Sequence, residues 1–371
     1  MQALSLLIKP VSGSCNMRCQ YCFYADVAAA REMPNRGMMR ISTLEHIVRR
    51  AFEEAEEFVS FGFQGGEPML AGRPYYQALI NLAEKHNPRG VPAAYSIQTN
   101  GTLIDAEWAG FFAENNFLVG LSIDGDKRVH NLLRPNAAGD TTHRACLNAA
   151  DMLARAGADF NVLSVVSKQF AAHPDAAWRF YKDNGFRFIQ LIACLDGLGQ
   201  EHGDNPFSLD ADSYGRFLCR FFDLWYADFI QGDYLSVRAF DNWVRMLMGQ
   251  QPENCGMLGH CQAYPVIEAD GSVYPCDFYV LDAYKLGDVA VDTFASMLAG
   301  EAAQRFEAPG KVIRDECLGC EYYVICRGGC RRDREPLQEG APSLNVHCAA
   351  YKQFFAHALP RMTDIAARMR P

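Results

Sequence analysis

The distribution of cysteine constrains this chain more than any other feature of its sequence. Eleven of the 14 cysteines fall into two groups. The early group is Cys15, Cys19 and Cys22, and the late group is Cys255, Cys261, Cys276, Cys317, Cys320, Cys326, Cys330 and Cys348. The three isolated cysteines are Cys146, Cys194 and Cys219, which we expect to act as small buried hydrophobic residues.

The composition favours metal binding over disulfide bonds for the grouped cysteines. Hydrophobic residues make up 49% of the chain and charged residues 21%, which is ordinary for a globular protein. The net charge of −9 and the lack of a Lys/Arg-rich run argue against nucleic acid or an anionic membrane as partner. No apolar stretch approaches the roughly 18 residues of a membrane span, and the first residues lack the basic leader of a signal peptide. We therefore expect a cytoplasmic protein, where disulfides rarely persist.

The first half of the chain alternates between strand and helix patterns. Short apolar segments predict strands at residues 4–9, 59–64, 94–99, 117–123, 160–166 and 188–192. Apolar residues at helical spacing predict helices at 44–55, 106–115, 144–156 and 175–184, the first preceded by a Ser42/Glu45 capping box. This alternation indicates an α/β fold of parallel βα units, a partial (β/α)6 TIM-like barrel.

Polar and glycine residues gather where the predicted strands end. These segments are 15–22, 64–67, 98–100, 122–124, 164–167 and 194–195. Because reactive groups of such barrels lie at the carboxyl ends of the strands, we expect the site there.

Composition changes suggest four parts of the chain. We expect the barrel to occupy residues 1–200, a helical connection 201–250, a cysteine-rich domain 251–350 and a C-terminal helix 351–371. The helical connection carries an aromatic stripe that we expect to be core rather than a binding groove. The cysteine-rich part contains a predicted hairpin over residues 264–275, with a type I′ turn at Asp270 and Gly271.

The early cysteines have the spacing C-x₃-C-x₂-C on one loop. Three thiolates can hold three irons of a four-iron cluster and leave the fourth iron open to a small molecule. A ferredoxin run would supply a fourth nearby cysteine, which is missing here. The pattern favours a catalytic cluster, with electron transfer alone as the lesser alternative.

This loop resembles that of the radical S-adenosylmethionine (SAM) enzymes. Tyr21 precedes the last cysteine, and residues 65–68 read Gly-Gly-Glu-Pro, which looks like the second SAM motif of that family. The resemblance implies that SAM binds the open iron and is cleaved to a 5′-deoxyadenosyl radical.

The late cysteines resemble the SPASM domain. That likeness implies two auxiliary [4Fe–4S] clusters besides the SAM-binding one. It assigns one to Cys255, Cys261, Cys276 and Cys330, and the other to Cys317, Cys320, Cys326 and Cys348. Spacing alone also allows two Cys₄ zinc sites.

Nearly the whole chain is similar to the anaerobic sulfatase-maturating enzymes, on segments such as FQGGEP, SIQTNGTLID and SVYPCDFYVLD. That family oxidises a Cys or Ser of an unfolded sulfatase peptide to Cα-formylglycine. The resemblance implies SAM contacts from Tyr21, Gly66, Ser122, Arg134 and Leu195, Asp277 as catalytic base, and reduced ferredoxin or flavodoxin as electron donor.

Other interpretations remain open, both for the roles of these residues and for the function of the chain. Asp277 could be a turn residue, Arg134 a solvated arginine, and Ser122 and Leu195 packing residues at a barrel end. The chain could be a SPASM enzyme that crosslinks peptides, an iron–sulfur electron carrier without catalysis, or a zinc-stapled interaction protein.

Overall fold

The computed structural model describes residues 1–338 and 341–369, which form two compact units. The first unit comprises Met1–Ser122, Leu133–Phe160 and Ala263–Phe306, and the second comprises the remaining segments. Residues 339–340 of the predicted cysteine-rich domain and residues 370–371 of the predicted C-terminal helix lie outside the described part.

The first unit is built on a mainly parallel sheet. Its strands are β1 (Ala3–Ile8), β2 (Phe58–Phe63), β3 (Ala93–Thr99), β4 (Phe117–Ser122), β8 (Val266–Ile267), β9 (Ser272–Tyr274) and β10 (Gly287–Asp288). The spatial order is β10-β9-β8-β1-β2-β3-β4, in which β8 through β4 run parallel while β9 and β10 join antiparallel. The register pairs Ile8 with Phe63 and Phe63 with Ile97, so the carboxyl ends of three strands meet at one edge.

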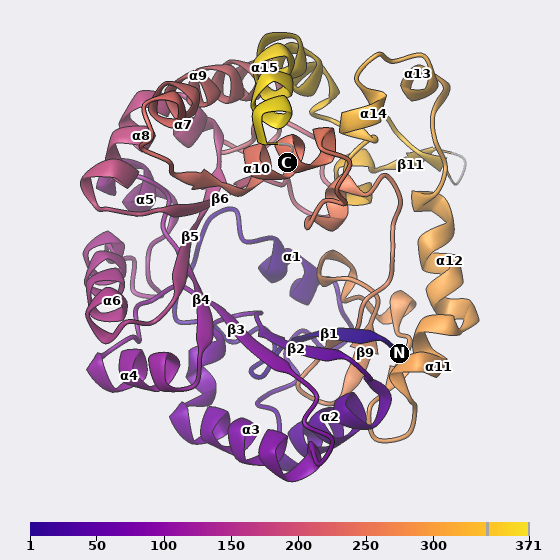
Figure 1. The fold of residues 1–371 in the computed structure, drawn as a ribbon. Helices are drawn as coiled ribbons and strands as arrows, with labels where there is room; N and C mark the ends of the chain where they lie inside the picture. The colour runs from indigo at the N-terminus through magenta and orange to yellow at the C-terminus, as the bar shows by residue number, and fades with distance from the viewer. Residues whose placement is uncertain (339–340, 370–371) are drawn as a thin grey trace. The chain divides into compact units, whose positions relative to one another are not determined.

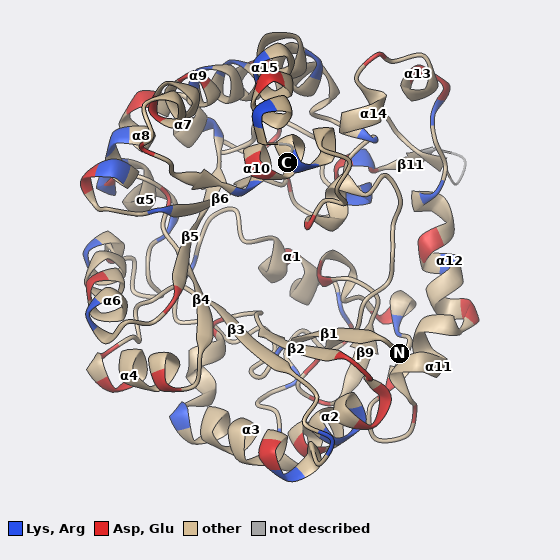
Figure 2. Ribbon diagram, viewed as in Figure 1, with Lys and Arg blue, Asp and Glu red and all other residues tan. Residues whose placement is uncertain are grey.

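The first unit also contains helices. They are α2 (Ile41–Glu54), α3 (Arg73–His86), α4 (Ala106–Glu114) and α6 (His143–Ala156), with the shorter α1 (Phe23–Ala29), α11 (Phe294–Ala299) and the first part of α12 (Glu301–Gly310). Figure 1 shows α2 and α3 along one side of β1 to β3, with α1 on the other side. Helix α2 buries Leu44, Ile47, Val48, Ala51 and Phe52, which share one face at helical spacing. Charged residues of both signs lie along α3 and α12 (Figure 2).

The second unit contains three parallel strands and the longest helices. Its strands are β5 (Phe160–Val166), β6 (Phe188–Ala193) and β7 (Ser236–Val237), and its helices include α5 (Lys127–Leu133), α7 (Lys168–Ala171), α8 (Pro174–Asp183), α9 (Ala211–Ile230), α10 (Arg238–Leu247) and α15 (Cys348–Met369). Helices α9 and α15 pack against each other. Most of the aromatic stripe of α9 is core, because Phe217, Phe221, Phe222 and Trp225 are buried, while Tyr226 and Phe229 are half-buried.

The rest of the chain forms short elements. These are η1 (Pro68–Ala71), η2 (Cys255–Met257), η3 (Asp277–Tyr279), η4 (Asp282–Tyr284), α13 (Asp315–Leu318), α14 (Tyr323–Cys326), η5 (Arg331–Arg334), β11 (Leu337–Gln338) and β12 (Ala341–Pro342). None of the helices in the described residues is long and apolar enough to cross a bilayer.

The predicted α/β fold is confirmed, and all six predicted strands form. Two local predictions are wrong. Helix α2 starts at Ile41 without a side-chain cap, and Glu45 bonds to Lys85 of α3 instead of closing a capping box. Between α9 and α10, the short strand β7 extends the strands of the second unit.

The predicted type I′ turn is the second error. That turn needs positive φ at both central residues, and Asp270 is not among the residues with positive φ. Instead, the Gly271 amide donates to the Glu268 carbonyl and only Gly271 has positive φ (94°). The hairpin itself is confirmed, but residues 268–271 connect β8 to β9, four residues instead of the predicted two.

Candidate functional site

The early cysteines lie on one loop at the carboxyl end of β1. The loop ends at Cys22, which directly precedes α1 and occupies its N-cap position. The Cys22 amide donates to the Cys19 carbonyl (3.3 Å), and the Met17 amide donates to Cys15 Sγ (3.4 Å). Burial, together with the nearby Glu67, Cys19 and Cys22, raises the pKa of the Cys15 thiol to about 11. Three thiols on one short loop are the soft donor set that iron–sulfur clusters use, so the chemistry of these residues fits such a group.

A backbone pairing holds this loop in place. Met17 forms an antiparallel bridge with Asn136, and the Arg18 and Gln20 amides donate to the carbonyls of Pro135 and Leu133 (both 2.9 Å). The segment after Leu133 therefore runs alongside the cysteine loop.

This pairing brings Arg134 to Tyr21. The guanidinium of Arg134 donates to Tyr21 Oη (3.1 Å), and both residues are buried. The interpretation of Arg134 as a solvated surface residue is therefore wrong.

The Gly-Gly-Glu-Pro turn also contacts the cysteine loop. Gly66 has φ of 51°, and a Cβ at this position would lie 2.1 Å from the Ser14 carbonyl oxygen. The Glu67 amide donates to that same carbonyl (2.8 Å). Only glycine combines this backbone conformation with this close approach.

The Glu67 carboxylate ties the turn to β3. It accepts from the Met69 and Asn100 amides (3.0 and 2.8 Å) and from Thr99 Oγ1 (2.8 Å). Burial raises the pKa of Glu67 to about 6 although these donors act in the opposite direction. Asn100 Nδ2 in turn donates to Asn16 Oδ1 in the cysteine loop (2.8 Å). The motif thus links the ends of β2 and β3 to the loop.

The two remaining SAM candidates lie elsewhere. Ser122 ends β4, and its hydroxyl accepts from Gln98 Nε2 (2.9 Å). Leu195 belongs to the second unit, where it follows β6 and lines a cavity of about 160 Å³. Tyr21, Gly66 and Arg134 thus lie around the cysteine loop of the first unit, and Leu195 belongs to the second unit.

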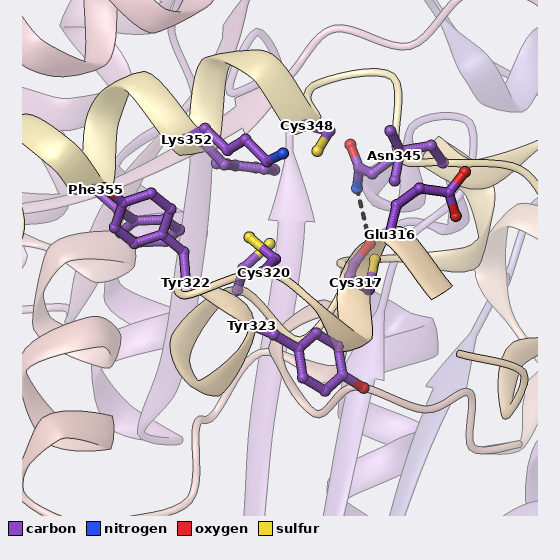
Figure 3. Close-up of a pocket in the computed structure, with 13 residues that line it drawn as sticks. Glu316, Cys317, Cys320, Tyr322, Tyr323, Asn345, Cys348, Lys352 and Phe355 are labelled. Atoms are coloured by element: carbon purple, nitrogen blue, oxygen red, sulfur yellow. Dashed lines mark hydrogen bonds between the residues drawn. The ribbon is translucent and has the colours of Figure 1, made fainter. Parts of the chain in front are cut away.

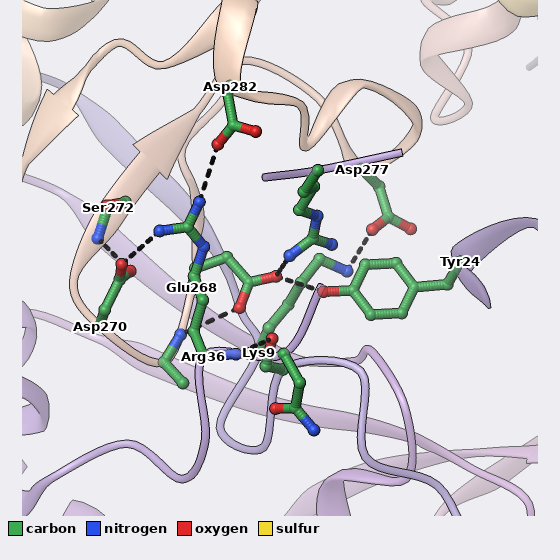
Figure 4. Close-up of polar contacts among 12 residues, drawn as sticks. Lys9, Tyr24, Arg36, Glu268, Asp270, Ser272, Asp277 and Asp282 are labelled. Atoms are coloured by element: carbon green, nitrogen blue, oxygen red, sulfur yellow. Dashed lines mark hydrogen bonds and ion pairs between the residues drawn. The ribbon is translucent and has the colours of Figure 1, made fainter. Parts of the chain in front are cut away.

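Asp277 is part of a buried polar network in the first unit (Figure 4). It directly follows Cys276 and begins η3. The Lys9 ammonium pairs with Asp277 Oδ1, while Gln64 Nε2 donates to Oδ2 (2.8 Å). The Asp277 amide donates to Tyr264 Oη (3.2 Å). A carboxylate fixed by this many partners is not a simple turn residue.

Four late cysteines surround one small cavity in the second unit (Figure 3). Cys317, Cys320, Cys326 and Cys348 line it, together with Lys352 of α15 and Tyr323 of α14. Burial, followed by the charges of the other three thiols, raises the pKa of Cys326 to about 11. This donor set also fits an iron–sulfur cluster.

The other late cysteines are divided between the units. Cys255, Cys261 and Cys330 belong to the second unit and Cys276 to the first. The Cys255 charge acts on Cys261, and Gly256 lies beside Cys330. In the described part of the chain, no group of three or more His, Cys, Asp or Glu side chains is placed to hold a metal ion, so the fit rests on donor chemistry and shared loops.

The isolated cysteines follow the prediction in part. Cys146 and Cys194 are buried, and Cys219 is half-buried. None of the 14 cysteines forms a disulfide.

The sequence did not point to Lys9, which pairs with Asp277 in the structure. Its signal was weak, a single lysine at the end of an apolar strand. Only the fold shows that β1 and the segment after β9 bring Lys9 and Asp277 together.

Comparisons with known proteins agree with this geometry. The chain matches the Radical SAM superfamily over residues 10–169 and the SPASM iron–sulfur cluster-binding domain over 258–321. It is 43% identical over 366 residues to a cysteine-type anaerobic sulfatase-maturating enzyme of Clostridium novyi, covering 99% of this chain and 98% of that protein.

This chain belongs to the anaerobic sulfatase-maturating enzymes. The structure of native anSMEcpe with bound AdoMet and Cp18Cys peptide superposes with a TM-score of 0.95 at 41% identity, covering 99% of this chain and 100% of that one. A serine-type family member of Bacteroides thetaiotaomicron is 31% identical, covering 97% of this chain and 90% of that protein. The chain is therefore a radical SAM enzyme with an auxiliary iron–sulfur domain.

Proposed function

We propose that this chain oxidises a cysteine of an unfolded sulfatase segment to Cα-formylglycine, with Asp277 as the base. The observation that carries the proposal is the Asp277 carboxylate, fixed by Lys9 and Gln64 directly after a cysteine of the auxiliary domain. A general base needs such a fixed position within reach of the proton that it removes.

Cys15, Cys19 and Cys22 would hold the SAM-binding cluster. When bound there, SAM would supply a 5′-deoxyadenosyl radical for removal of a hydrogen atom from the substrate Cβ. Tyr21, Gly66, Ser122, Arg134 and Leu195 would bind and orient SAM. Support for Arg134 comes from its burial beside Tyr21, because the fork of a guanidinium suits a carboxylate such as that of SAM.

The substrate must then lose one proton and one electron. The thiol proton would pass to Asp277, and the electron would leave through the iron–sulfur clusters that the two auxiliary cysteine sets would hold. These sets are Cys255, Cys261, Cys276 and Cys330, and Cys317, Cys320, Cys326 and Cys348. Loss of the hydrogen atom, the proton and the electron converts the cysteine to a thioaldehyde. Water then hydrolyses it to formylglycine, with release of hydrogen sulfide.

Cysteine is the proposed target because this chain is more similar to cysteine-type relatives, at 43% identity, than to the serine-type relative, at 31%. We also propose reduced ferredoxin or flavodoxin as electron donor and the cytoplasm as the place of reaction. The absence of disulfides among 14 cysteines supports a reducing compartment.

The test uses an anaerobically reconstituted protein with SAM, reductant and a Cys-x-Pro-x-Arg peptide, beside its serine twin. Mass spectrometry follows the peptide, and 5′-deoxyadenosine is quantified in parallel. We expect an aldehyde on the cysteine peptide, in rough proportion to deoxyadenosine. Deoxyadenosine with both peptides unchanged would contradict the substrate class, and oxidation of the serine peptide alone would contradict the cysteine preference.

Asp277→Asn provides the test of the base. Loss of the Asp277 carboxylate should lower formylglycine formation by about 10²- to 10⁴-fold, the usual contribution of a positioned base. Deoxyadenosine should still form, because hydrogen abstraction precedes the proton transfer. Wild-type rates of aldehyde formation in this variant would exclude Asp277 as the base.

A further inference from the structure

Lys9 is a charged residue without access to solvent. Its exposed fraction is 0%, and its ammonium pairs with Asp277 Oδ1. In the described residues this is the only ion pair of Lys9. Burying an ammonium costs several kcal/mol, and a buried ion pair often adds less stability than packed apolar residues would. A gain in stability is therefore a weak explanation for the presence of this buried pair.

The surroundings of Lys9 hold its side chain in one position. The Lys9 ammonium lies 4.0 Å from the centre of the Tyr24 ring. The Tyr24 hydroxyl donates to Glu268, which also accepts from Arg31 (2.6 Å), so the ring is itself fixed. A Cβ at Gly65 would lie 2.9 Å from Lys9 Cγ. The first glycine of the Gly-Gly-Glu-Pro motif thus leaves the space that the lysine occupies.

Lys9 and Gln64 both bond to the Asp277 carboxylate, and they occupy equivalent positions directly after two paired strands. Lys9 follows Ile8 of β1, Gln64 follows Phe63 of β2, and Ile8 and Phe63 are partners in the sheet register. The backbone amide of Gln64 donates to the Ile8 carbonyl (3.0 Å). Each side chain takes one carboxylate oxygen, which fixes the plane and direction of the carboxylate.

We propose that Lys9 is a positioning residue that, with Gln64, aims the Asp277 carboxylate at the substrate proton. This inference rests on the proposed function of Asp277 as base. Lys9 acts through Asp277 and does not itself react. Loss of the bonds from Lys9 and Gln64 to Asp277 should leave hydrogen abstraction intact and impair the proton transfer that follows it.

The readout is the yield of formylglycine per 5′-deoxyadenosine, measured with Lys9→Met, Lys9→Arg and Gln64→Leu. We expect Lys9→Met to lower this yield at least about tenfold, since an ångström of misplacement can cost more than that. Lys9→Arg keeps the charge and should restore part of the yield. Gln64 is half-buried, so Gln64→Leu releases the second oxygen with little risk to folding, and it should lower the yield in the same direction.

Lys182→Met is the matched control. Lys182 also pairs with aspartates, Asp228 and Asp233, but it is partly exposed and lies in the second unit. This variant should keep the wild-type yield.

A second measurement is independent of turnover. Thermal unfolding of Lys9→Met, Asp277→Asn and the double variant forms a double-mutant cycle. The midpoint shifts should be non-additive, because the two side chains contact each other.

The outcomes separate the two proposals. A wild-type protein that makes no formylglycine would contradict the proposed function. Wild-type activity with unchanged yields in Lys9→Met and Gln64→Leu would overturn the positioning role alone. Equal losses of deoxyadenosine and formylglycine in both variants would also overturn it, because they would indicate a general structural role.

Discussion

At Gly66, backbone conformation and available space impose the same constraint. Its φ of 51° lies in the left-handed region, and a Cβ there would collide with the carbonyl that also accepts from Glu67. Any other residue must therefore displace the cysteine loop at Ser14.

We predict that Gly66→Ala loses the iron of the early cysteine loop, about a third of the total if three clusters are bound. Iron analysis and the absorbance of the reconstituted protein measure this loss. Gly90→Ala is the matched control, because Gly90 also has positive φ (67°) but no atom within 4 Å of the added Cβ. Both variants carry a backbone cost of about 1–2 kcal/mol, so a shared loss of iron would contradict the steric explanation.

Motif spacing singles out site residues that lie close together in the chain, whereas Arg134 and Asp277 were named only by the family resemblance. Cys15, Cys19 and Cys22 share a loop, and Gly66 belongs to a turn at a strand end. Lys9 could not be predicted, because its partner Asp277 is 268 positions away. Only the sheet order, with β8 beside β1, brings such distant residues together.

At the scale of elements, hydrophobic periodicity predicted the strands of the barrel well because burial imposes it directly. Helix starts and turns depend on a few hydrogen bonds, and there the predictions of the Ser42/Glu45 capping box and the type I′ turn failed. Glu45 contacts charged and polar side chains of α3 instead of the backbone at the start of α2. Lys85 Nζ and His86 Nε2 lie 2.6 and 2.9 Å from its carboxylate.

Those contacts give a prediction for the packing of α2 on α3. Hydrogen bonds from Lys85 and His86 lower the pKa of Glu45 from 4.5 to about 2. A lowered carboxyl pKa stabilises the fold above the unfolded value and loses this effect as the pH falls from 4.5 toward 2. Glu45→Gln should therefore unfold at lower urea concentration than the wild type at pH 7, and this difference should shrink below pH 4.5.

Urea unfolding followed by circular dichroism at pH 7, 4 and 3 measures the difference. Glu53→Gln on the same helix is the control, because it breaks an exposed pair with Arg49 one helical turn away. It should change the midpoint less. An equal deficit for Glu45→Gln at every pH would contradict the ionic explanation.

At the scale of the whole molecule, the proposed reaction depends on two cysteine sets that lie in different parts of the chain. The early loop belongs to the first unit, and Cys317, Cys320, Cys326 and Cys348 belong to the second. If the first set starts the reaction and the second carries electrons away, their loss should have different consequences.

We predict that Cys320→Ala loses about a third of the bound iron and lowers formylglycine yield, while the early loop still supports 5′-deoxyadenosine formation. The reason is that hydrogen abstraction needs only the first set, whereas completion of the oxidation needs an electron acceptor. Cys219→Ala is the control, because Cys219 lies on α9 outside both groups and should keep full iron content. Full formylglycine yield in Cys320→Ala would exclude this set from the electron path. Loss of zinc instead of iron would identify the set as a structural zinc site, and the electron would then have to leave through Cys255, Cys261, Cys276 and Cys330 alone.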